Sequence, residues 1–117
     1  MLRRADIRLI EQIVRTTGDR GIRYVGLVVP FDRRLGADWE GFAESQPGPP
    51  MVRRYPEARL NDLYDRLDVP AVMLLDDFQP YLDEVLPYID GHLSAAGHRR
   101  AAEALYGAFV DAGIVPE

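Results

Sequence analysis

Two short apolar runs, separated by one amphipathic segment, constrain the fold more than any other feature of this sequence. The runs are I-R-Y-V-G-L-V-V-P at residues 22–30 and V-P-A-V-M-L-L-D-D at residues 69–77. Short, nearly continuous apolar runs of this kind predict strands that are buried on both faces of a sheet. Between them, apolar residues recur at helical spacing after Pro56, at Leu60, Leu63, Tyr64 and Leu67. A strand, a helix and a strand in this order predict a parallel pair joined by a right-handed crossover.

Two more helices are predicted, one near each end of the chain. The spacing of Ile7, Ile10, Ile13 and Val14 predicts a helix over residues 5–17. Its end is indicated by the turn T-G-D-R-G at residues 17–21. The last helix is expected to begin near Ser94 and to stop at Gly113, where glycine suits a left-handed C-terminal cap.

Residues 31–54 show no regular apolar period and contain Pro47, Pro49 and Pro50, so they are expected to form a long loop. Within them, R-R-L-G-A-D-W-E-G-F-A at residues 33–43 is compatible with one short helical turn. The fold class is therefore α/β, with about two parallel strands and three main helices. A two-stranded parallel sheet leaves a strand edge open, which is typical of half of a doubly wound domain.

The composition excludes several classes of protein. A chain of 117 residues makes at most one domain. The absence of cysteine excludes disulfides, thiolate metal sites and cysteine nucleophiles. A net charge of −5 gives no reason to expect nucleic acid as a partner. No apolar run reaches the roughly 20 residues of a membrane span. The charged start, M-L-R-R-A-D-I-R-L-I-E, does not read as a signal peptide, so the localisation stays unassigned.

The stretch D-G-H-L-S-A-A-G-H, residues 90–98, holds both histidines of the chain. It precedes the last helix and follows the second strand, where parallel α/β sheets gather their reactive groups. A histidine exchanges protons near neutral pH, and a neighbouring carboxylate orients its ring. Asp90 and His92 are therefore the candidate catalytic residues, and Ser94 is expected to cap the helix. The alternative is a turn aspartate and a helix-flanking histidine without chemistry. Zinc sites usually show tighter ligand spacing than Asp90 and His98, so no metal ligand is predicted.

The longer stretch D-G-H-L-S-A-A-G-H-R-R-A-A-E-A-L resembles the last conserved block of SGNH (GDSL-type) hydrolases. The order of the preceding helices and strands is similar to the carboxyl-terminal half of that family's flavodoxin-like three-layer fold. The resemblance covers most of this chain and about half of a family domain. It implies that His92 is the general base, that Asp90 orients it, and that the reaction is acyl transfer from an ester to water or to a sugar hydroxyl. It implies no metal or organic cofactor.

The other parts of the family's catalytic apparatus have no counterpart in the sequence. The resemblance implies a G-D-S block that carries the nucleophile and a G-x-N-D block that supplies an oxyanion donor. Ser45 has no Gly-Asp before it, Gly18-Asp19 is followed by Arg20, and Asn61 stands in L-N-D-L. We therefore predict one partial domain over residues 1–117 that carries the Asp-His pair and is inactive alone as an esterase.

A non-catalytic α/β module that completes its sheet with a partner chain is the alternative from another class. In that case a second copy or a partner chain covers the open sheet edge, whereas the hydrolase takes an ester or an O-acylated small molecule or carbohydrate. A complete flavodoxin-like or receiver-like domain would need about five strands, and the sequence predicts two.

Overall fold

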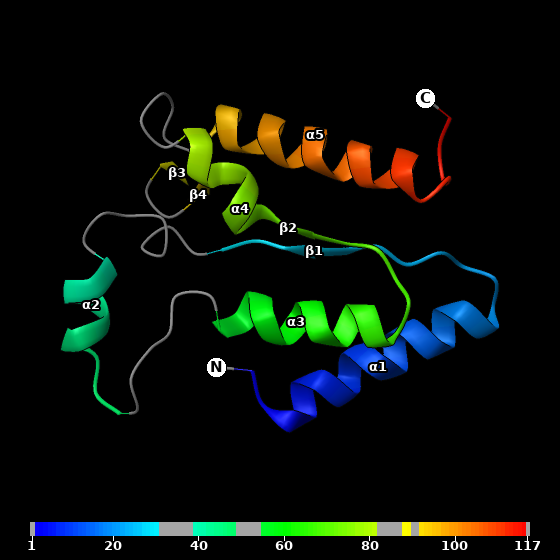
Figure 1. Cartoon of the computed structure of the whole chain (residues 1–117), viewed down its shortest axis with the longest axis horizontal. Coiled ribbons are helices and arrows are strands. Elements are labelled where there is room, and N and C mark those ends of the chain that lie inside the picture. The colour runs from blue at the N-terminus through cyan, green and yellow to red at the C-terminus, as the bar shows by residue number, and fades with distance from the viewer. Residues whose placement is uncertain (1, 31–38, 49–54, 82–87, 90–91, 117) are drawn as a thin grey trace.

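The computed structural model describes residues 2–30, 39–48, 55–81, 88–89 and 92–116. This part of the chain is mixed α/β and mostly helical (Figure 1). The elements in chain order are α1 (Arg4–Asp19), β1 (Gly26–Val28), α2 (Trp39–Ser45), α3 (Tyr55–Arg66), β2 (Ala71–Met73), α4 (Leu74–Phe78), the 3₁₀ turn η2 (Gln79–Tyr81), β3 (Tyr88–Ile89), β4 (His92–Leu93) and α5 (Ala95–Asp111). The predicted parallel pairing is confirmed in β1 and β2, and β3 and β4 form a separate antiparallel pair.

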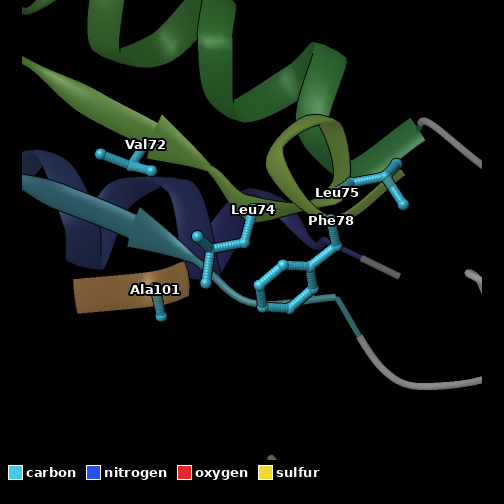
Figure 2. Packing of buried hydrophobic residues seen from close by; sticks show 5 residues of the cluster. All are labelled: Val72, Leu74, Leu75, Phe78 and Ala101. Carbon is cyan, nitrogen blue, oxygen red and sulfur yellow. The ribbon is translucent and has the colours of Figure 1, made fainter. Parts of the chain in front are cut away.

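Helices lie on both faces of the β1–β2 pair. On one face, Val72 of β2 packs with Leu74, Leu75 and Phe78 of α4 and with Ala101 of α5 (Figure 2). On the other face, the neighbouring Met73 packs in a cluster with α3, through Leu60, Leu63 and Tyr64. Because successive side chains of a strand point to opposite faces, one short strand supports both clusters. Figure 1 accordingly shows α4 and α5 on one side of the pair and α1 and α3 on the other.

The three main helices lie where the apolar spacing predicts them, and they end in the same way. The residue after the last turn has a left-handed backbone at Gly21, Asp68 and Gly113, with φ of 68°, 55° and 68°. In each case the next N–H donates to a carbonyl five residues earlier: Ile22 to Thr17 at 2.9 Å, Val69 to Tyr64 at 3.1 Å and Ile114 to Phe109 at 2.9 Å. These bonds satisfy carbonyls that would otherwise be left unpaired at the helix end. The predicted stop at Gly113 is confirmed.

The prediction that residues 22–30 form a strand buried on both faces is wrong. Only Gly26–Val28 pair with β2. Leu27 is 40% exposed and Val29 is 47% exposed, although Val72, the partner of Leu27, is 7% exposed. The physical reason is that the apolar cluster which α4 and α5 form on this face includes Val72 but neither Leu27 nor Val29.

The prediction of a strand over residues 69–77 is also wrong beyond Met73. The chain turns there into α4, because Leu74, Leu75 and Phe78 gather on the side that faces α5. Asp76 and Asp77 therefore lie on a short helix and not at the end of a strand. In the segment expected to be a loop, 31–54, α2 occupies residues 39–45, and residues 31–38 and 49–54 lie outside the described part.

Gly26 of β1 lies against the ring of Tyr64, which predicts a severe effect of adding a single methyl group. A Cβ at this position would stand 2.7 Å from Cζ of Tyr64. The ring cannot move away easily, because it is buried and its hydroxyl group lies 3.2 Å from that of Tyr24. We expect Gly26→Ala to lower the free energy of unfolding by about 1–3 kcal/mol, measured from urea denaturation curves.

Gly18 provides the matched control for this prediction. It lies in α1, and a Cβ there meets nothing within 4 Å. Gly18→Ala should leave stability unchanged or raise it slightly, because alanine restricts the unfolded chain more than glycine does. Equal denaturation midpoints for the two variants would show that Tyr64 does not hold the position that the structure gives it.

Candidate functional site

His92 is the predicted catalytic residue that the structure places. It is the first residue of β4 and its side chain is exposed. Its backbone is held on one side by pairing with Ile89 of β3. On the other side the next residue, Leu93, packs against the apolar cluster around Val72 and Phe78. The imidazole is therefore presented to solvent from a backbone that is anchored to the core.

The helix cap predicted at Ser94 is confirmed. Ser94 is buried, and its Oγ accepts a hydrogen bond of 3.0 Å from the backbone N–H of Gly97. Its carbonyl accepts a second bond of 2.9 Å from the N–H of His98, which closes the first turn of α5. The first bond satisfies one of the N–H groups that every helix leaves unpaired at its start, and the second is the first regular backbone bond of the helix. The cap thereby fixes the path of the chain two residues after His92.

Asp90 and Gly91 lie outside the described residues, so the geometry of the predicted Asp90–His92 pair stays a prediction. The pairing of Ile89 with His92 leaves two residues between the strands. Asp-Gly is among the sequences that two-residue hairpin connections favour. The dipeptide is thus suited to a hairpin connection as well as to the predicted catalytic role. The signal was present in the sequence as Y-I-D-G-H-L, but two paired residues on each side are too few to show strand periodicity.

The hydroxyl groups of the two serines have other roles in the structure. Ser45, in α2, donates a hydrogen bond of 2.7 Å to the carbonyl of Phe42. Ser94 accepts from Gly97 as the cap of α5. Neither of these two described hydrogen bonds joins a serine hydroxyl group to a histidine ring. The hydrogen bonds described for the two serines therefore serve the structure, and the proton transfer predicted for His92 stays a prediction.

Asp77 is the titratable group of α4 whose pKa clearly departs from its ordinary value. Burial raises the pKa of this carboxyl group, and the charge of the adjacent Asp76 raises it further. A raised pKa in the folded state means that ionised Asp77 costs stability at neutral pH, and the cost falls as the pH drops through the raised pKa.

In the described part of the chain no group of three or more histidine, aspartate or glutamate side chains could hold a metal ion. The described helices include none that is long and apolar enough to span a membrane.

Comparisons with protein-family profiles, with curated proteins and with solved structures find no match to this chain.

Removing the Ser94 hydroxyl should destabilise the protein through the start of α5. We expect Ser94→Ala to lower the free energy of unfolding by about 1 kcal/mol, because the N–H of Gly97 loses its acceptor. Ser94→Asp supplies a capping oxygen again and should recover part of this loss at neutral pH, since a carboxylate is favourable at a helix start. Thermal unfolding followed by circular dichroism measures both variants. An alanine variant as stable as the parent would contradict the cap.

Proposed function

We propose that this chain is the carboxyl-terminal portion of an SGNH-type serine hydrolase and that His92 is its general base. The observation that carries the proposal is the local arrangement at the start of α5. An exposed histidine stands two residues before a serine-capped helix, within the sequence D-G-H-L-S-A-A-G-H. The anchored backbone on both sides of His92 suits a group that must hold one position during proton transfer.

In the proposed mechanism, His92 takes the proton of a serine hydroxyl while the serine oxygen attacks the ester carbonyl. His92 then gives that proton to the leaving alkoxide, which leaves an acyl-serine. In the second half of the reaction, His92 takes a proton from a water molecule, which attacks the acyl-serine and releases the acid. In the transferase variant, a sugar hydroxyl takes the acyl group instead of water. Asp90 orients the ring and stabilises the imidazolium. The serine comes from a polypeptide segment outside these 117 residues, and the mechanism requires no metal or organic cofactor.

The β1–β2 pair supports a larger, flavodoxin-like sheet as the context of this site. In the described part β1 pairs only with β2. The exposed Leu27 and Val29 show that one face of β1 has room for a further covering element. Parallel sheets are buried on both faces when they are complete. A polypeptide that adds strands beyond β1 and packs a helix on this face would cover these side chains.

The test compares the 117-residue chain with the same chain extended by the coding sequence that precedes Met1. The proposal expects this extension to contain a Gly-Asp-Ser block after a strand and to hydrolyse p-nitrophenyl acetate. In the extended protein, His92→Ala should lower kcat/KM by about 10³-fold or more, because the serine loses its base. The 117-residue chain alone should show no turnover that depends on His92.

His98 provides the control for this experiment. It is also exposed and lies in α5, one turn after the cap. His98→Ala should leave turnover unchanged in the extended protein. Two results contradict the proposal: an upstream sequence without a serine block, or turnover by the 117-residue chain that His92→Ala abolishes.

A second candidate function is a non-catalytic module whose β1 edge binds a partner chain. Leu27 of β1 and the adjacent Val29 are exposed, and among the described residues β1 pairs only with β2, which favours this function. If a second copy covers this edge, light scattering should give a dimer, and the amides of β1 should exchange slowly with deuterium. Leu27→Lys should then produce monomers, whereas Leu9→Lys, on exposed α1 surface, should not. A monomer with rapidly exchanging β1 amides excludes self-association at this edge.

A further inference from the structure

The helix α1 carries apolar side chains on two of its faces, and one of these faces is exposed. On the first face, Ile7 and Ile10 pack against the cluster around α3, and Val14 is buried. On the neighbouring face, Leu9 is 59% exposed and Ile13 is 50% exposed. Figure 1 shows α1 at the margin of the molecule, with α3 between it and the β1–β2 pair. Apolar residues on two faces of one helix are expected where other polypeptide covers both faces.

The exposed face of α1 has the spacing of a coiled-coil seam. Coiled coils place their contact residues alternately three and four positions apart. On α1 this spacing runs through the two exposed apolar residues, begins at an acidic residue and ends at a basic residue just after the helix. The positions of this seam are Asp6, Leu9, Ile13, Thr16 and Arg20. Because only the middle of the seam is apolar, it suits a short contact that ends in charged groups.

A hollow of about 380 Å³ lies on the same face of α1. Its lining consists of Leu9, Gln12, Ile13 and Thr16, together with Thr17. The first four of these residues stand at positions i, i+3, i+4 and i+7 of the helix. In a coiled coil, four residues of this kind form the hole that receives a side chain of the facing helix. The hollow is therefore lined as a second helix with an aliphatic side chain would require.

The charges at the ends of the seam favour a second copy of α1 in antiparallel orientation. In a parallel pair, Asp6 would stand beside Asp6 of the second copy and Arg20 beside Arg20, and like charges repel. In an antiparallel pair that sets Leu9 opposite Ile13 of the second copy, Asp6 lies about one helical turn from Arg20 of that copy. Helical side chains lean toward the amino end of their own helix, so in this orientation Asp6 and Arg20 lean toward each other.

We propose that α1 pairs in antiparallel orientation with α1 of a second copy of this chain, with Leu9 and Ile13 at the centre and an Asp6–Arg20 ion pair at each end. Asp6 already accepts a hydrogen bond of 2.8 Å from the backbone N–H of Arg3. A carboxylate has about four acceptor sites, so it can accept from Arg20 as well. Arg20 is exposed. The inference does not depend on the proposed hydrolase, because none of these residues belongs to its site.

Sedimentation equilibrium of the 117-residue chain at about 10 µM to 2 mM tests the association. We expect a reversible monomer–dimer equilibrium with a Kd of about 0.1 mM, because two apolar side chains from each copy make a small interface. Leu9→Lys should raise this Kd about tenfold or more, since it brings charge into the centre of the seam. Leu27→Lys makes the same kind of change on β1 and should leave the Kd within about twofold. Circular dichroism shows whether each variant is folded.

Arg20→Glu tests the antiparallel orientation. The new carboxylate would face Asp6 of the second copy at both ends of the pair, so the Kd should rise about tenfold. In a parallel pair one contact between like charges would replace another, and the Kd would stay the same. Arg15→Glu is the matched control, because Arg15 is exposed on the same helix but does not belong to the seam. It should change the Kd by less than about twofold.

Three results overturn the proposal. The first is a chain that stays monomeric up to about 2 mM, which would assign the exposed face of α1 to a different polypeptide. The second is a dimer that Leu27→Lys weakens as much as Leu9→Lys does, because that dimer would form elsewhere on the molecule. The third is an equal effect of Arg20→Glu and Arg15→Glu, which would show that Arg20 does not meet a carboxylate of the second copy.

Discussion

The opposite orientations of Val72 and Met73 in β2 organise the rest of the described structure. Val72 faces α4 and α5, and Met73 faces α3, so each side chain joins one of the two apolar clusters. The parallel pairing with β1 sets Val28 beside Met73 and places Gly26 where the ring of Tyr64 fits. Two strands of three residues each thus hold α4 and α5 in one layer and α1 and α3 in the other, around a small core.

The direction of the strands gives the molecule two chemically different ends. At the carboxyl end of the sheet, the chain presents an exposed His92 two residues before the buried cap of α5. At the amino end, the carboxyl termini of three helices meet around one cleft. The first end carries the histidine on which the proposed hydrolase depends.

The open side of β1 connects the fold with the proposed function. Leu27 is exposed on the face on which its partner, Val72, is buried. The same observation favours a larger parallel sheet and a partner chain, because either would cover this side chain. The two candidates differ in what the covering polypeptide brings. A hydrolase needs a serine that reaches His92, whereas an interaction module needs only a strand.

The sequence alone determined the three main helices, the parallel pair and the cap at Ser94, because each depends on local spacing or on a single side chain. It did not determine where the strands stop. Leu74, Leu75 and Phe78 are as apolar as a buried strand, and their packing against α5 decides that they form a helix. Neither the exposure of Leu27 nor the meeting of three helix ends can be read from spacing, because both depend on contacts between segments far apart in the chain. The sequence places Asp90 and His92 two positions apart, but only tertiary packing presents His92 to solvent.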